Sequence, residues 1–217
     1  MIQEDFDIEL YNMQYSVILN CLKFKDHPSM EEIFDGMNHL QEKFRDAIIQ
    51  FFNSDLIINL QHIIYAIYFS QRAFSQEINI SNKISIEFLL YLAANRQIKI
   101  AIDSFGIRAE NLDQGPIYMC IVSEKTRSMQ IYEELRNLFD VEEINLQFPD
   151  FTSEKIVRIK NFYNISEDQI SSILSTSDSD HISNFIDKKN VEIIQGALLG
   201  IVCEKMALLS LEGVKFD

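Results

Sequence analysis

Glycine is scarce in this chain of 217 residues, where it occurs six times, at positions 36, 106, 115, 196, 200 and 213. Walker-type loops and dinucleotide fingerprints need closely spaced glycines, because the backbone must approach the phosphates. The six glycines match neither pattern, so the sequence excludes both kinds of nucleotide site. Disorder is excluded as well, since 47% of the residues are hydrophobic and 16 Phe and 8 Tyr can fill a core.

Cysteine is also rare, and Cys21, Cys120 and Cys203 lie far apart in apolar runs. An odd number of cysteines at such spacing is typical of small core residues in a reducing compartment, rather than of disulfides or metal ligands. We therefore expect an intracellular, cytoplasmic protein.

Histidine provides no candidate metal or catalytic site. His27, His39, His62 and His181 have no partners at ligand spacing among Cys, Asp or Glu. His62 lies within an apolar segment, where a hydrogen-bonded structural role is favoured over a catalytic or metal-binding one. Because no nucleophile and base can be paired by spacing either, we expect a non-catalytic chain without metal, cofactor or small-molecule substrate.

Long uninterrupted apolar runs are missing too. Residues 48–69 and 191–211 are the most apolar stretches, but Asp55 and His62 interrupt the first, and Glu192, Glu204 and Lys205 the second. A membrane span needs roughly 20 predominantly apolar residues, so we expect no membrane association. The formal net charge of −14 also repels polyanions on average, so any nucleic-acid contact must be a local exception.

The order of the expected elements indicates an α+β fold, a single compact domain with a mixed, mainly antiparallel sheet packed by several helices. Ser29 and Glu32 form a capping box at the start of the first helix, and Ser166 and Gln169 form another. We expect an N-terminal extension over residues 1–14, a domain over 15–217 and a loop insertion at 175–189. The expected strands are 17–24, 48–52, 117–122, 143–148 and 208–211, and the expected helices are 29–44, 54–67, 85–95, 96–105, 131–138, 153–162, 167–174 and 191–206.

The helix pattern also predicts three further details. Ser54 and Ser85 are assigned as N-caps of their helices, and Gly106 as a left-handed residue that ends the helix starting at Arg96. The strand 117–122 has no polar alternation, so both of its faces are expected to be covered.

Residues 72–108 form a basic island in an acidic chain. This stretch has five basic and three acidic residues, a net charge of +2, whereas the remaining 14 basic and 30 acidic residues give −16. The break at Ala93-Ala94-Asn95 leaves free N–H groups at the N-terminus of the following helix, where anions bind favourably. Arg96 is poorly placed for that helix dipole unless an anion lies nearby. A solvated helix boundary remains the alternative reading.

The final helix is apolar around its whole circumference. Its polar residues, Glu192, Gln195, Glu204 and Lys205, are scattered, so we expect burial on more than one side. Gly196 and Gly200 allow another backbone to approach closely. Burial within the domain and docking of a partner protein both remain open. The candidate contact residues are Ile194, Leu198, Leu199, Ile201, Val202 and Met206.

Several segments, in this order and spacing, resemble the PRPK-binding protein family, also called TPRKB, over residues 45–213. They are 51–57 (FFNSDLI), 62–67 (HIIYAI), 85–91 (SIEFLLY), 95–98 (NRQI) with Ala101-Ile102, and 202–209 (VCEKMALL). The chain departs from the family in its longer N-terminus, in the insertion at 175–189 and in Ala93-Ala94, where a Ser-Gly pair is expected.

The resemblance implies a non-enzymatic subunit of KEOPS, the complex that adds threonylcarbamoyl to adenosine in tRNA. It implies that the final helix binds the atypical kinase subunit and that the Arg96 region binds the single-stranded CCA end of tRNA. Archaeal members of the family bind that end. A protein-only adaptor and an enzyme with a spatially assembled site are the alternatives. The implied RNA-binding residues are Arg72, Lys83, Asn95, Arg96, Gln97, Ile98 and Lys99.

Overall fold

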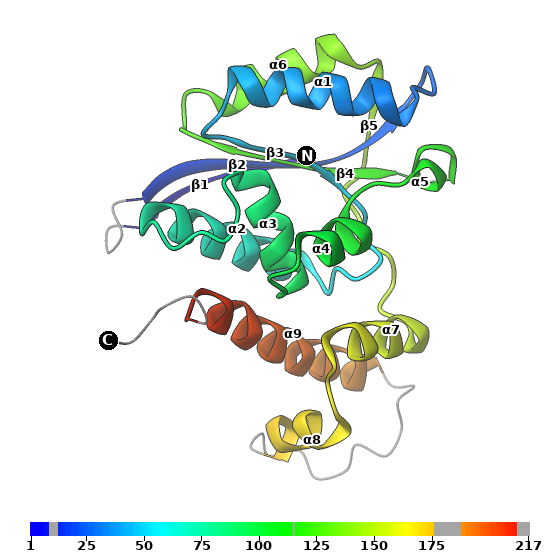
Figure 1. Cartoon of the computed structure of the whole chain (residues 1–217). Coiled ribbons are helices and arrows are strands. Elements are labelled where there is room, and N and C mark those ends of the chain that lie inside the picture. The colour runs from blue at the N-terminus through cyan, green and yellow to red at the C-terminus, as the bar shows by residue number, and fades with distance from the viewer. Residues whose placement is uncertain (9–12, 115, 176–187, 212–217) are drawn as a thin grey trace.

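The computed structural model describes residues 1–8, 13–114, 116–175 and 188–211. It confirms the expected α+β fold, in which helices pack on both faces of one sheet (Figure 1). The strands are β1 (Ile2–Ile8), β2 (Met13–Phe24), β3 (Ile48–Phe52), β4 (Ile117–Ser123) and β5 (Val141–Ile144). The helices are α1 (Met30–Lys43), α2 (Leu60–Ser75), α3 (Ile84–Ala93), α4 (Ile98–Phe105), α5 (Ala109–Gln114), α6 (Ser128–Leu138), α7 (Ser153–Tyr163), α8 (Glu167–Ser175) and α9 (Lys188–Leu211).

The sheet is antiparallel throughout, in the order β1-β2-β4-β3, and β5 pairs with one end of β2. All residues of β4 are buried, which confirms the prediction that this strand is covered on both faces. β2 is central because it is long enough to pair with three strands. β3 has β4 as its one neighbour among the described strands, so it forms an edge of the sheet.

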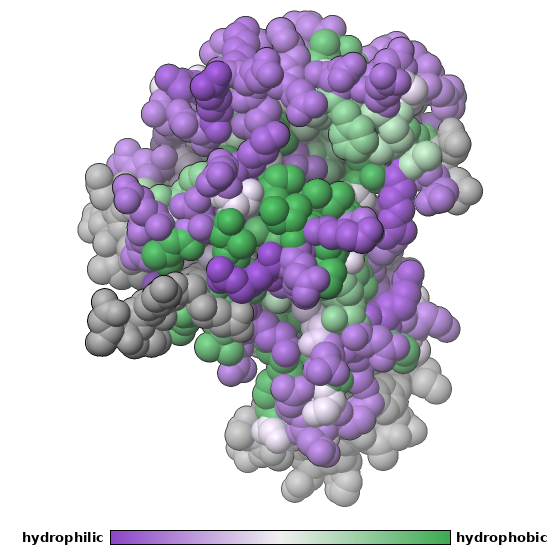
Figure 2. Space-filling view, viewed as in Figure 1, coloured by the Kyte–Doolittle hydropathy of each residue, from purple (hydrophilic) through white to green (hydrophobic). Residues whose placement is uncertain are grey.

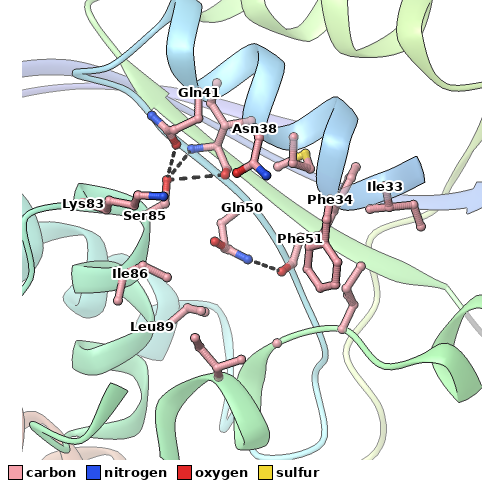
Figure 3. A pocket seen from close by; sticks show the side chains of 15 residues that line it. Ile33, Phe34, Asn38, Gln41, Gln50, Phe51, Lys83, Ser85, Ile86 and Leu89 are labelled. Carbon is pink, nitrogen blue, oxygen red and sulfur yellow. Dashed lines mark hydrogen bonds between the residues drawn. The ribbon is translucent and has the colours of Figure 1, made fainter. Parts of the chain in front are cut away.

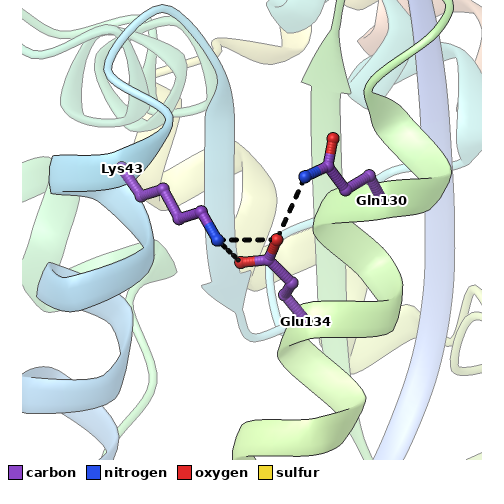
Figure 4. A network of polar contacts seen from close by, with 3 residues as sticks. All are labelled: Lys43, Gln130 and Glu134. Carbon is purple, nitrogen blue, oxygen red and sulfur yellow. Dashed lines mark hydrogen bonds and ion pairs between the residues drawn. The ribbon is translucent and has the colours of Figure 1, made fainter.

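Helices α1 and α6 cover one face of the sheet, and α2, α3 and α4 cover the other (Figure 1). Helix α9 packs beneath α2 and α3, beside α7, and forms an additional layer. Two hydrophobic clusters result, one on each face of the sheet, and α9 belongs to the larger of them. An ion pair joins α1 and α6, since Lys43 Nζ lies 2.7 Å from Glu134 Oε2, and Gln130 Nε2 donates to the same carboxylate (Figure 4).

Both capping boxes are confirmed. At the start of α1 the Glu32 backbone N–H donates to Ser29 Oγ, and the Ser29 N–H donates to the Glu32 carboxylate at 2.7 Å. Ser166 and Gln169 make the same reciprocal pair before α8. These bonds satisfy N–H groups that the first helical turn cannot pair internally.

The roles predicted for Ser54, Ser85 and Gly106 at helix ends are wrong, although α4 does end at Phe105 as expected. Helix α2 begins at Leu60 and is capped by Asn59, because residues 54–57 form a single turn, closed by the Ile57 N–H on the Ser54 carbonyl, and not the first helical turn. Ser85 does not cap α3, because its hydroxyl bonds to Ile49 and Gln41 instead. Gly106 has an extended backbone (φ −65°), and glycine is needed there because a Cβ would lie 2.6 Å from the Ile102 carbonyl oxygen.

The two ends of the chain also differ from the sequence-based expectation. Residues 2–8 form strand β1, which pairs with β2 and stacks Phe6 on Tyr15. The strand expected at 208–211 is instead the continuation of α9. The edge strand expected at 143–148 overlaps β5 at residues 143–144 alone, because β5 begins two residues earlier and ends at Ile144. The loop expected at 175–189 falls mostly outside the described residues.

Candidate binding surfaces

The α3–α4 turn is built around a left-handed alanine. Ala94 ends α3 with φ 42°, and the Asn95 N–H closes the turn on the Leu90 carbonyl. The Asn95 side chain accepts from the Gln97 N–H at 2.9 Å, and α4 begins at Ile98 without a side-chain cap. A left-handed non-glycine residue costs roughly 1 kcal/mol, so surrounding contacts must stabilise this turn.

An open depression of about 490 Å³ lies beside this turn. Its walls come from three places in the sequence, which are residues 93–97, residues 162–164 at the end of α7, and Lys205, Leu208 and Leu209 of α9. Arg96 and Lys205 contribute positive charge, and none of the described lining residues is acidic. The depression therefore suits an anion in an otherwise acidic protein.

Arg96 makes a hydrogen bond within the chain that its position in the sequence did not reveal. Its Nη1 donates to the backbone carbonyl of Leu209 at 2.9 Å, in the last turn of α9. A cation at the C-terminal end of a helix is favoured by the helix dipole. Arg96 therefore stabilises α9, as well as facing the depression.

The structure divides the other implied RNA-binding residues between the two ends of α3. Asn95, Arg96 and Gln97 line the depression. Lys83 precedes α3, eleven residues and about 16 Å from Ala94 along the helix. On the near side, Ile98 is 44% exposed and Lys99 pairs with Asp103 in solvent. Arg72 lies in the last turn of α2, where its Nε donates to Gln76.

Helix α9 has one buried face, which corrects the expectation of burial on several sides. The buried side chains pack on α2, α3 and α8 within this domain. Five of the six candidate contact residues belong to that face, and Leu199 is half-buried. Their burial agrees with the first of the two alternatives, in which the final helix is buried within the domain. The five are Ile194, Leu198, Ile201, Val202 and Met206.

The opposite face of α9 is open, and small or apolar residues lie on it between the exposed Glu192 and Glu204. Gly196 and Gly200 are exposed, and a Cβ added at either would meet no atom within 4 Å. Cys203 and Ala207 are half-buried on the same face, and Leu211 at its end is 50% exposed. Because the side chains are small, another backbone can approach this face closely. The sequence indicated this approach through the spacing of the two glycines.

His62 is a structural residue, as predicted. It is fully buried, its Nδ1 accepts from the Ile58 N–H, and its Nε2 lies 3.1 Å from the Leu92 carbonyl oxygen. Tyr163 bonds to the same carbonyl. Burial lowers the pKa of His62 to about 4, so the ring is neutral and holds α2 against α3 and α7.

No pattern in the sequence predicted a second hollow, which is apolar. It lies between α1 and the α3–α4 pair along the edge of β3, and Figure 2 shows hydrophobic side chains gathered there. Phe34 is 53% exposed and Ile102 is 42% exposed at its rim. Its walls come from four separate elements, so periodicity within any one of them could not reveal it.

Within the described ranges, no group of three or more His, Cys, Asp or Glu residues is arranged to hold a metal ion. None of the described helices is long and apolar enough to cross a membrane.

The open face of α9 is the kind of surface on which a binding protein docks a partner. A protein-family model described as "Kinase binding protein CGI-121" matches residues 30–210. The chain therefore belongs to the CGI-121 family of kinase-binding proteins, as the resemblance to the TPRKB family predicted. A search of curated proteins finds no match to the chain.

Proposed function

We propose that this chain is the small, non-catalytic KEOPS subunit that holds the atypical kinase and the CCA end of tRNA, supporting threonylcarbamoyl-adenosine formation in the cytoplasm. The observation that carries the proposal is the family match, which extends over residues 30–210 and includes the open face of α9.

The kinase docks on the open face of α9. Gly196 and Gly200 leave room for a backbone, while Leu199, Cys203 and Ala207 offer apolar contact at its centre. Interface cores are depleted in charge and closely packed, which this face satisfies between Glu192 and Glu204. The buried residues of α9, Leu198 and Met206 among them, support this face from behind.

The test is co-purification of the kinase with Gly200→Trp. The indole projects into open space, so the variant folds but obstructs the docking face, and loss of co-purification is expected. Val157→Trp on α7 is the matched control, because Val157 is 53% exposed and lies outside α9. Normal kinase binding by a folded Gly200→Trp protein would disprove this docking face.

The tRNA end binds in the depression beside Ala94. Arg96 and Lys205 attract the phosphates, and Gln97 presents an amide to a base. Ile98 and Lys99 extend the contact along α4, while Arg72 in the last turn of α2 and Lys83 before α3 contact more distant phosphates. A single-stranded end needs a local basic surface with apolar contacts, so the overall charge of −14 is no obstacle.

Binding of intact tRNA and of tRNA lacking CCA separates this role from a protein-only adaptor. Lys205→Glu should weaken binding of intact tRNA more than binding of the shortened tRNA, and wild-type binding should fall as salt rises. Lys25→Glu, which lies outside the depression, is the control. Equal binding of both tRNAs, or binding that does not change with salt, would favour the adaptor that uses the kinase alone.

A further inference from the structure

The apolar hollow beside β3 coincides with an open position on the edge of the sheet. The backbone groups of alternate β3 residues point away from β4. At one end the Ile49 N–H donates to Ser85 Oγ at 3.1 Å, and at the other the Asn53 N–H donates to the Phe105 carbonyl at 2.9 Å. The backbone groups of Phe51, between them, point the same way, and Phe51 lines the hollow (Figure 3).

A side-chain amide occupies the place of a neighbouring strand at Phe51. Gln50 turns back along the edge, and its Nε2 donates to the Phe51 carbonyl at 2.7 Å (Figure 3). In the strand sequence, Gln50 is polar at a position whose neighbours on the same face, Ile48 and Phe52, are buried and apolar. When the Gln50 side chain rotates away, the Phe51 carbonyl can accept a hydrogen bond from an incoming backbone N–H.

The two walls of the hollow lie on opposite faces of the sheet. Ile33 and Phe34 come from α1, whereas Ile86, Leu89 and Ile102 come from α3 and α4. Successive side chains of a strand also point to opposite faces. A strand added at Phe51 would therefore direct alternate side chains against the two walls, where the hollow provides about 170 Å³.

The charge of the hollow indicates one further property of the bound segment. Lys83 is the one charged residue among the described lining residues, and it lies two positions from Ser85, at the Ile49 end. Because Ser85 Oγ occupies the edge beside Ile49, the incoming segment leaves β3 after its pairing with Phe51, and an acidic residue just beyond that point would lie on the Lys83 side of the hollow. The walls are mainly aliphatic, with Phe34 the one exposed aromatic side chain among the described lining residues, and they carry a single cation. This composition favours a peptide over RNA, whose binding uses several stacking aromatics and several cations.

We propose that this hollow, lined by Phe34, Phe51, Lys83 and Ile102, binds an extended segment of a partner protein. The segment adds a short strand to β3 at Phe51, places apolar side chains against both walls and pairs a carboxylate with Lys83. This surface is separate from the open face of α9 and from the depression beside Ala94, although it shares Lys83 with the proposed tRNA contact. The inference depends neither on kinase docking nor on tRNA binding.

The probe is a displayed library of random peptides of about ten residues, selected on the full chain, with the best peptide then synthesised. We expect alternating apolar residues with one acidic residue. We expect about tenfold weaker binding to Ile102→Asp and to Lys83→Glu, and unchanged binding to Val157→Asp on α7. Exchange of the peptide's acidic residue for lysine should restore binding to Lys83→Glu.

Backbone N-methylation of the peptide, one residue at a time, distinguishes strand addition from a nonspecific apolar contact. One methylation, at the residue paired with Phe51, should abolish binding, and its two neighbours should tolerate it. If Ile102→Asp fails to fold, Asn38→Trp fills the exposed rim from α1 and should block the same peptide. Failure to select a peptide sensitive to these variants overturns the proposal, as does displacement of the peptide by single-stranded RNA ending in CCA.

Discussion

The guanidinium of Arg96 donates from Nη1 to the backbone carbonyl of Leu209 at 2.9 Å, and so ties the α3–α4 turn to the last turn of α9. The two residues are 113 positions apart in the sequence. The wall of the proposed RNA depression and the helix of the proposed kinase surface are thus joined by one side chain.

Replacement of Arg96 by methionine should lower the free energy of unfolding by about 1–2 kcal/mol, because a charge-assisted hydrogen bond at a helix C-terminus is lost. Urea denaturation measures the change. Lys99→Met is the control, because the Lys99 side chain is 88% exposed and should be nearly neutral. Equal stability of the two variants would show that the bond to Leu209 contributes nothing.

His62 should make stability depend on pH between about 6.5 and 4. Its pKa is lowered from 6.5 to about 4 in the folded protein, so below 6.5 the unfolded chain binds a proton that the native state excludes. The stability present above pH 6.5 is therefore lost as pH falls, by about 2 kcal/mol between pH 7 and pH 5 from this group.

Urea midpoints of the wild type and His62→Gln, measured at both pH values, isolate this contribution from the carboxylates. The wild type should lose more stability than His62→Gln on acidification, whereas His39→Gln, an exposed control, should behave like the wild type. Parallel pH profiles for wild type and His62→Gln would contradict a buried neutral ring.

Lys155 on α7 is 1% exposed, and its ammonium bonds to the Ser54 carbonyl at 3.3 Å. Burial lowers its pKa from 10.5 to about 8, so between pH 8 and 10.5 the unfolded chain holds the extra proton and stability rises with pH. Lys155→Met should raise stability at pH 7 by about 1 kcal/mol, since an apolar side chain of similar length avoids the desolvation cost.

The same substitution should flatten the rise in stability between pH 8 and 10, measured as the urea midpoint. Lys99→Met again serves as the control. A Lys155→Met protein that is less stable at pH 7 would mean that the bond to Ser54 outweighs desolvation.

The glycines of α9 and the glycine after α4 should respond oppositely to alanine. Gly196→Ala and Gly200→Ala should each add about 0.5–1 kcal/mol, because alanine favours the helix and its Cβ meets no atom. Gly106→Ala should destabilise, because its Cβ would lie 2.6 Å from the Ile102 carbonyl oxygen. Thermal unfolding of the three variants measures this contrast, and destabilisation by Gly196→Ala or Gly200→Ala would refute an open face.

The sequence by itself determined the features that depend on neighbours along the chain. The capping boxes at Ser29 and Ser166 involve residues three apart, and the unbroken apolar run of β4 required cover on both faces. Family membership was also readable, because it rests on the order and spacing of short segments.

Only the tertiary structure decided which surfaces remain open. In α9, apolar residues surround the axis, so periodicity could not tell the face that packs on α2 from the face with Gly196 and Gly200. Arg96 looked unpaired because its acceptor, Leu209, is brought near only by folding. Burial and distant hydrogen bonds depend on contacts between elements, and the hollow at Phe51 exists only where four such elements meet.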